Sequence, residues 1–252
     1  MPNVNKTRTT VGDGVADIGK FRATPPAGID PVGASTEGVS IYELIREDII
    51  EGRLSANERL VVADLAERHG TSTNPVREAL QQLRGEGFVI LTPNRGARVR
   101  PIDEDFIRDI SEVTALIEPF LVRWYVGMAT HEDIAELERL QDLIEDNAFK
   151  DPVLHSEIDT AFHTLMYERH YNRHIAQLWW RNREVLRAVT RRMDYTLARR
   201  AAVIRDHRQL IQCIKDQDAD LAAETISRHV SGSGRHIVEQ MRAHKMHRGA
   251  MA

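Results

Sequence analysis

The sequence has little cysteine and no long apolar run. Cys213 is the only cysteine among 252 residues, so the chain cannot close an internal disulfide, and a small buried apolar side chain is the ordinary interpretation of such a residue. No stretch is apolar enough to cross a bilayer, and the first residues lack the apolar core of a secretion signal. These absences predict a cytoplasmic protein that does not contact membranes.

An excess of positive charge is also missing. The chain holds 34 Lys and Arg against 38 Asp and Glu, a formal net charge of −4. Residues 37–101 hold nine arginines and ten acidic residues, a difference of −1. A broad cationic surface that coats nucleic acid nonspecifically is therefore excluded. Any contact with DNA must come from a few well-placed side chains.

Motifs of several enzyme classes are absent as well. The sequence has no His-Glu-x-x-His, no Glu three residues before any histidine, and no Gly-x-Ser-x-Gly. The zinc-protease pattern, the di-iron bundle pattern and the nucleophile elbow are therefore excluded. We do not expect an enzyme, and a metal-dependent hydrolase with another ligand pattern remains the alternative.

The patterning indicates two domains after a tail, because a chain of this length can bury two cores. Residues 1–36 mix Gly, Pro, Thr and Asp without periodicity and predict a flexible tail. Helical spacing at 39–50, 61–68 and 72–86 is followed by β-rich runs at 88–91 and 97–100, around a turn at 93–96. Residues 37–101 are thus predicted to form a winged helix-turn-helix.

Only helical patterning follows Pro101. The predicted helices span 103–128, 132–147, 153–171, 174–196, 199–215 and 219–246. Short connectors between them predict an antiparallel all-α bundle of six to seven helices in residues 102–247, so the fold class is mainly α. Gly232 and Gly234 are poor helix formers and predict a kink or early break in the last helix.

The third helix carries side chains suited to the major groove. Its apolar residues face the small core, which leaves Ser72, Thr73, Asn74 and Arg77 outward near its N-terminus. Arg77 can donate two hydrogen bonds to a guanine edge, and Asn74 can pair with adenine or a phosphate. Ser72 and the free N–H groups at the helix start suit a phosphate oxygen.

The hairpin adds Arg95 and Arg98, because Gly96 permits a tight tip that brings them to the DNA backbone or minor groove. Each arginine also has an ordinary interpretation: Arg77 can pair with Glu78 or Glu86, and Arg95 can be a solvated loop residue. Their combination in this order nevertheless favours binding to double-stranded DNA.

The bundle carries residues with metal-ligand chemistry. Asp159 and His163 are four residues apart and project from one helix face, while His207 and His229 lie on the last two helices. Together they would bind a divalent transition metal such as zinc, nickel or manganese and leave room for a ligand oxygen. His170 and His174 compete as a pair, although a helix break at 171–172 would spoil their alignment.

The N-terminal domain resembles the GntR family of bacterial regulators. The resemblance rests on residues 59–68 (RLVVADLAER), 75–83 (PVREALQQL) and 93–99 (PNRGARV), which span nearly the whole domain. That family usually has an Arg directly after the Ser at position 72, where this chain has Thr73. The resemblance therefore implies DNA binding with an altered base or phosphate contact.

The helical part resembles the FCD effector domain of the FadR subfamily, so that the resemblance covers about residues 40–245. It rests on residues 111–119, 159–163, 206–208 and 228–230. It implies a metal held by Asp159, His163, His207 and His229, beside a small organic acid. Thr114 stands where many relatives carry an Arg, which implies a different effector or the recruitment of Arg187 or Arg191.

We therefore expect a transcriptional repressor that binds operator DNA as a homodimer. A small organic or sugar acid, bound as a carboxylate beside the metal, would control its DNA binding by shifting the bundle. A dimerisation module with a purely structural metal site is the second alternative.

Overall fold

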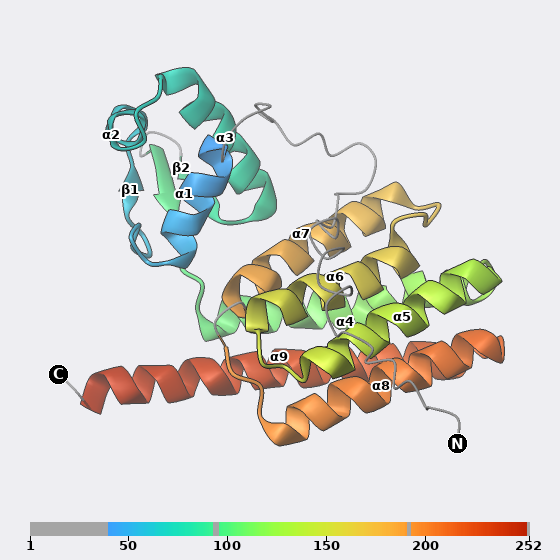
Figure 1. The fold of residues 1–252 in the computed structure, drawn as a ribbon. Coiled ribbons are helices and arrows are strands. Elements are labelled where there is room, and N and C mark those ends of the chain that lie inside the picture. Colours follow the sequence, from blue (N-terminus) through green and yellow to red (C-terminus); the bar gives the residue numbers. More distant parts are fainter. Residues whose placement is uncertain (1–39, 93–95, 191–192, 251–252) are drawn as a thin grey trace, which may run out of the picture.

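The computed structural model describes residues 40–92, 96–190 and 193–250 of the chain. These residues form a small domain with a three-stranded sheet and a larger helical bundle (Figure 1). The predicted tail at 1–36, Arg95 and Arg191 lie outside the described residues. Among the described helices, none is both long and apolar enough to cross a membrane.

The smaller domain is the predicted winged helix-turn-helix. Its helices are α1 (Ile41–Ile50), α2 (Val62–Arg68) and α3 (Thr73–Glu86). Its strands are β1 (Arg59–Leu60), β2 (Val89–Thr92) and β3 (Gly96–Val99), which form an antiparallel sheet in the order β1-β3-β2. Strand β1 was not predicted, because two residues are too short to show an alternating pattern.

Local sequence explains where the helices of this domain begin and end. Ser40 and Glu43 form a capping box, in which each side chain accepts the other residue's backbone N–H at the start of α1. Helix α3 ends at Gly87, whose φ of 91° is left-handed and favours glycine. The buried faces of α1, α3 and the sheet meet in a core that includes Ile45, Leu83 and Phe88.

The larger domain contains the six predicted helices. They are α4 (Glu104–Val126), α5 (His131–Asn147), α6 (Pro152–Tyr167), α7 (Arg173–Thr190), α8 (Leu197–Lys215) and α9 (Ala219–Ala250). Side-chain oxygens of Asp103, Thr130, Asp151 and Thr196 accept backbone N–H groups at the starts of α4, α5, α6 and α8. The buried core of this domain includes Leu121, Phe162 and Trp179.

Helices α6 and α7 end earlier than the sequence predicts. Helix α6 ends at Tyr167 rather than 171, and in the segment that follows the Asn172 backbone N–H donates to His170 Nδ1 at 3.0 Å. Helix α7 ends at Thr190, and residues 193–196 are not helical. There, the Thr196 hydroxyl accepts the Arg199 N–H and starts a new helix. The residue that marks the boundary between α7 and α8 is therefore the N-cap of α8, Thr196.

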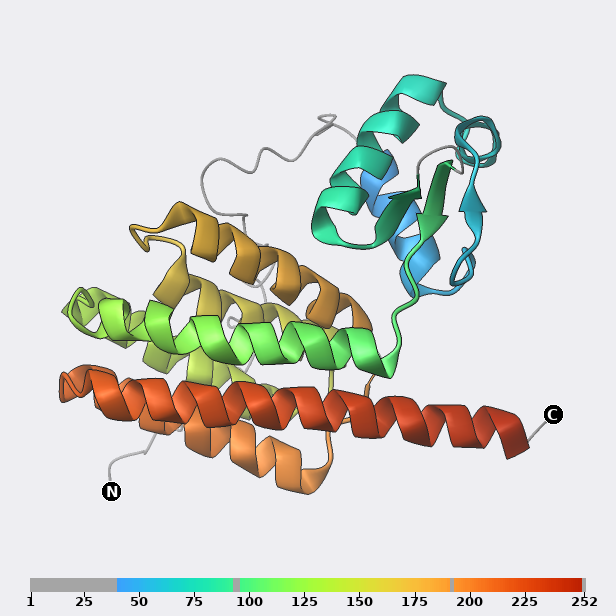
Figure 2. The ribbon, with the colours of Figure 1, turned by 180° about the vertical axis from the view of Figure 1, so that it is seen from behind.

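The predicted kink in α9 is wrong, because α9 continues through both glycines. Helices α4 and α9 lie side by side and antiparallel (Figure 2). A Cβ at Gly234 would lie 2.5 Å from Ser111 Oγ of α4, and one at Gly232 would lie 2.8 Å from Arg199 Nη1 of α8. The glycines therefore allow close contacts with neighbouring helices, which offsets their low helix propensity.

The two domains share part of a core. Ile110 of α4 and Val185 and Ala188 of α7 are buried in the same cluster as the apolar residues of the winged domain. Across this boundary, Arg46 of α1 forms an ion pair with Glu184 of α7 at 2.9 Å. Helix α7 therefore lies between the winged domain and the bundle interior (Figure 1).

Candidate metal centre and nucleic-acid interface

The exposed start of α3 presents the residues expected to contact DNA. Ser72, Thr73, Asn74 and Arg77 are all exposed. Ser72 stands at the N-cap with extended backbone, but its hydroxyl makes no capping hydrogen bond. Ser72 thus leaves the first N–H groups of α3 without a side-chain cap, and a phosphate could accept hydrogen bonds from them.

The two interpretations of Arg77 can now be compared. Glu86 accepts hydrogen bonds from Tyr42 at 2.6 Å and from Gln82 at 3.1 Å, so its carboxylate is engaged elsewhere. Within the described residues, no carboxylate lies within 4 Å of the Arg77 guanidinium. Arg77 is therefore available to a partner outside this part of the chain.

The wing arginine Arg98 has a different environment. Its Nη1 donates to the carbonyl of Asn57 at 2.7 Å, and the residue is half-buried. Arg98 therefore ties β3 to the loop before β1 in this conformation. A contact with DNA would use the part of the guanidinium that this bond leaves open.

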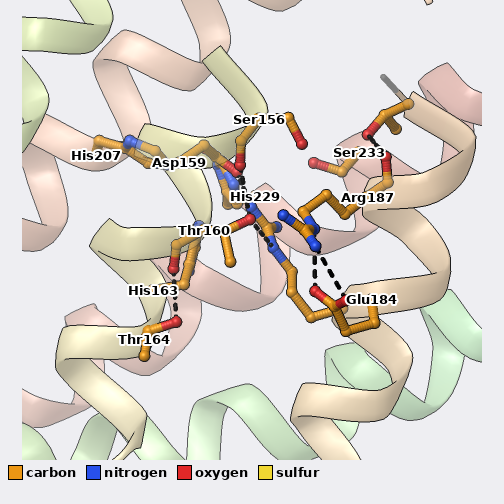
Figure 3. Close-up of polar contacts among 12 residues, drawn as sticks. Ser156, Asp159, Thr160, His163, Thr164, Glu184, Arg187, His207, His229 and Ser233 are labelled. Atoms are coloured by element: carbon orange, nitrogen blue, oxygen red, sulfur yellow. Dashed lines mark hydrogen bonds and ion pairs between the residues drawn. The ribbon is translucent and has the colours of Figure 1, made fainter. Parts of the chain in front are cut away.

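Three helices bring together the four residues expected to bind metal. Asp159 and His163 come from α6, His207 from α8 and His229 from α9 (Figure 3). One ligand atom from each lies within 4.8 Å of all the others. Asp159 Oδ1 is 3.6 Å from His207 Nε2. The three imidazoles are buried, so the cluster is a site inside the bundle.

A neighbouring amide orients the imidazole ring of His207. Gln141 Oε1 lies 2.9 Å from His207 Nδ1, and Glu118 Oε2 lies 3.8 Å from His163 Nδ1. Phe162 stacks on the His207 ring with centroids 4.3 Å apart. Because Gln141 accepts from Nδ1–H, the lone pair of His207 Nε2 faces Asp159 and the cluster.

The electrostatics give these groups the protonation states of metal ligands. Burial holds the pKa values of His163 and His229 well below their usual range and lowers the pKa of His207 to about 4. Burial opposes ionisation of Asp159, but the Arg183 guanidinium outweighs it and holds the pKa of Asp159 well below its usual range. At neutral pH, the site holds neutral imidazoles and one carboxylate.

The cluster fits a divalent transition metal by the chemistry of its donors. Nε2 of His163 and Nε2 of His207 are buried without a hydrogen-bond partner among the described residues. Unpaired buried polar atoms are costly unless a ligand satisfies them. Three imidazole nitrogens and a carboxylate oxygen are a donor set that zinc, nickel or manganese accepts.

Arg183 of α7 is a partner of the site that the sequence did not predict. Its guanidinium donates to Asp159 Oδ2 and, through Nε, to Thr160 Oγ1 at 3.2 Å. Asp159 thus uses Oδ2 for Arg183 and presents Oδ1 to the histidines. Arg183 lies 24 residues from Asp159 in a helix with several other arginines, so spacing alone could not have selected it.

A cavity of about 50 Å³ adjoins the cluster. Asp159 and His229 line it together with three arginines, Arg183, Arg187 and Arg199. Arg187 was among the residues expected to bind an effector, and its guanidinium is held by Glu184 at 3.0 Å (Figure 3). Tyr195, Ser233 and Arg199 were not predicted, because they come from segments without a recognisable motif.

Other sequence predictions lie away from this cavity. Thr114 is buried on α4, donates to the Ile110 carbonyl at 2.7 Å and is not part of the cavity lining. His170 is buried against Phe120 and Trp124, whereas His174 is exposed. The competing histidine pair is therefore not brought together.

Known proteins are similar to both domains. Residues 38–99 match the family described as bacterial regulatory proteins, gntR family, and residues 109–232 match the FCD domain. The galactonate operon transcriptional repressor of Escherichia coli K12 is 27% identical over 198 residues, which cover 70% of this chain and 86% of that protein. The HTH-type transcriptional repressor RspR of the same strain is 26% identical over 200 residues, covering 75% and 84%.

Solved structures share the fold. The structure of E. coli McbR/YncC aligns with a TM-score of 0.61 and 21% identity, covering 80% of this chain and 96% of that one. A putative GntR regulator from Rhodococcus sp. RHA1 aligns with a TM-score of 0.59 and 20% identity, covering 79% and 96%. The arrangement of a winged domain on a helical bundle is thus common to these proteins.

Proposed function

Because the chain belongs to the GntR family of bacterial regulatory proteins and carries an FCD domain, we propose that a small organic or sugar acid, bound beside a divalent metal ion, controls its binding to operator DNA. The chain is a DNA-binding transcriptional regulator, as its relatives are, and not an enzyme. We assign repression to it because both E. coli relatives are named as repressors.

The DNA contacts are assigned to the start of α3 and to the wing. Arg77 and Asn74 would read base edges in the major groove, while Ser72 and the helix N-terminus would hold a phosphate. Arg98, with Arg95 before it in the chain, would contact the backbone or minor groove. Thr73 stands where the family usually has an Arg, so the operator preference should differ there.

The observation that carries the proposal is the convergence of Asp159, His163, His207 and His229 within 4.8 Å. These residues would hold the metal, and a bound divalent ion supplies a position at which an oxygen of the effector can bind. Gln141 keeps Nε2 of His207 directed at the site, and Arg183 fixes Asp159. A carboxylate effector is supported by the arginines in the adjoining cavity and by a relative named for a galactonate operon.

Helix α7 offers a route from the effector cavity to the DNA-binding domain. Arg183 and Arg187 line the cavity, and Arg187 contacts Glu184 on the same helix. Glu184 also contacts Arg46 of α1, while Arg181 donates to the Gly85 carbonyl of α3 at 3.4 Å. A ligand that moves Arg183 or Arg187 would thus displace the surface on which α1 and α3 rest.

Metal analysis of the purified protein tests directly whether the four clustered residues bind a metal. The purified protein should contain a divalent metal, or take one up after treatment with a chelator, and zinc, nickel or manganese should raise its melting temperature. Absence of bound metal together with an unchanged melting temperature for all three ions would contradict the proposed site.

A further inference from the structure

Three arginines line the cavity beside the metal cluster, and they differ in whether a carboxylate lies close to them. Arg183 is paired with Asp159, and Arg187 is paired with Glu184. Arg199, at the start of α8, is 8% exposed. No described carboxylate lies within 4 Å of its guanidinium. A buried cation without a counter-ion is costly, so the cavity is suited to an anion.

The surroundings of Arg199 hold its guanidinium at the cavity. Its Nη2 donates to the Ser233 hydroxyl and to the His229 carbonyl at 3.4 Å, while its Nε is buried without a hydrogen-bond partner among the described residues. Ser233 and His229 also line the cavity. The Arg199 guanidinium thus contacts the backbone of His229, whose side chain belongs to the metal cluster.

Gly232 provides the space that this guanidinium occupies. A Cβ at position 232 would lie 2.8 Å from Arg199 Nη1, closer than side-chain carbons normally approach another atom. Glycine inside a helix is unfavourable relative to alanine by on the order of 1 kcal/mol. The close approach of Arg199 gives a physical reason for glycine at this position. Helix α9 thus leaves room for the Arg199 guanidinium beside the cavity.

We propose that Arg199 is the carboxylate receptor of the effector cavity, and that the effector is a short acid with a second oxygen donor, a hydroxy acid or a dicarboxylic acid. One carboxylate pairs with Arg199, and the hydroxyl or second carboxylate lies toward Asp159 and the histidines. The cavity of about 50 Å³ and the short path from Arg199 to His229 require a small molecule. This inference rests on the proposed function, because the second oxygen is assigned to the metal side.

Arg199 also explains how the chain could bind an acid without an arginine at position 114. Thr114 hydrogen-bonds within α4 and lies outside the cavity, whereas Arg199 reaches the same cavity from α8. A guanidinium can donate two parallel hydrogen bonds to a carboxylate. Such charge-assisted hydrogen bonds are stronger than hydrogen bonds between neutral groups.

The test uses the full-length, zinc-loaded protein and a panel of lactate, malate, tartrate and malonate, with the corresponding amides as uncharged probes. Calorimetry should show binding of at least one acid of the panel and of none of the amides. Arg199→Met should weaken binding of that acid on the order of 10- to 100-fold, the loss expected for charge-assisted hydrogen bonds. Arg208→Met, a surface arginine of the same helix paired with Asp142 and Glu145, is the matched control and should leave the affinity unchanged.

A second variant keeps the charge and changes only its position. Gly232→Ala should displace the end of the Arg199 side chain and weaken acid binding, while zinc affinity and the fold are retained because alanine favours the helix. Equal acid affinity in wild type, Arg199→Met and Gly232→Ala would overturn the assignment of Arg199. Failure of every acid to bind the zinc-loaded wild type would overturn the assigned ligand class. Failure of zinc itself to bind would instead contradict the proposed function.

Discussion

Arg77 is the residue on which sequence-specific DNA binding should depend most. It is an exposed guanidinium near the start of α3 and has no described carboxylate partner. Replacing it with alanine should cost about 1–3 kcal/mol of operator affinity if it reads a base edge. Fluorescence anisotropy with a labelled operator, compared with unrelated DNA, measures this loss.

Arg84 supplies the matched control for this experiment. It is an exposed arginine on the same helix, two turns farther from the N-terminus. Arg84→Ala should lower affinity little and equally for specific and unrelated DNA. If both variants behave alike, Arg77 contributes only charge, and its assignment to a base is wrong.

His207 tests whether the metal serves the effector or the fold. Its ring is fully buried, stacks on Phe162 and presents Nε2 to Asp159. His207→Ala should reduce zinc affinity by about 10-fold or more. The variant should remain folded and bind operator DNA without responding to the effector. His174→Ala, which removes an exposed histidine, is the control. An unfolded His207→Ala protein would instead indicate a structural metal.

The buried histidines should make the metal-free protein sensitive to acid. Burial lowers the pKa values of His163, His207 and His229 below their value of about 6.5 in an unfolded chain. The unfolded state therefore binds more protons below about pH 6.5, and the free energy of unfolding should fall as the pH is lowered through about 6.5 toward 5. Urea denaturation of the chelated protein at several pH values measures this slope. A slope of zero or opposite sign would contradict the burial of neutral imidazoles.

At the scale of residues, the sequence indicated the candidate metal ligands but not the side chains that contact them. The four candidate ligand residues were chosen from helical spacing and a family resemblance, and the structure places their side chains together. Arg183, Arg199 and Gln141 were missed because their roles depend on how α7, α8 and α5 pack against the site. Spacing along one helix defines a face, but it does not reveal which side chains of other helices meet that face.

Among the elements, α7 should carry the coupling between the two domains. Glu184 is 5% exposed and contacts Arg46 of α1 and Arg187 of the cavity lining. Glu184→Gln should weaken both ion pairs, so the effect of the acid on operator affinity should shrink, while zinc and acid still bind. Coupling free energies of this kind are typically about 1–3 kcal/mol.

The control is Glu138→Gln, which disrupts an exposed ion pair with Lys215 of α8. Operator affinities with and without acid should be unchanged relative to wild type. A Glu184→Gln variant that keeps the full acid response would exclude this route through α7.

Element types could be predicted from the sequence, whereas some element ends could not. The apolar spacing of α4 to α9 is long and regular, so their existence followed directly. The end of α7 depends on the cap formed by Thr196 with Arg199, and β1 exists only because Arg59 and Leu60 pair with Arg98 and Ala97 of β3. From the sequence alone, Gly232 and Gly234 predict a break in the helix. Their role becomes clear only from the structure, where Arg199 and Ser111 approach them closely.

For the whole molecule, we expect a homodimer on a pseudo-palindromic operator. Two-fold symmetry would place the two α3 helices in successive major grooves, about 34–36 Å apart. Light scattering should give twice the chain mass of 28.7 kDa, and footprinting should protect two half-sites separated by one or more helical turns. A monomeric mass in the presence of operator DNA would contradict this arrangement.

The most direct measurement is the operator affinity of the zinc-loaded protein with and without a bound acid from the hydroxy acid and dicarboxylic acid panel. The account predicts that the acid changes the dissociation constant by roughly 5- to 150-fold, and that removal of zinc by a chelator or the Arg199→Met substitution abolishes the change. An operator affinity that stays the same with and without acid, in a protein shown to bind both zinc and the acid, would contradict it.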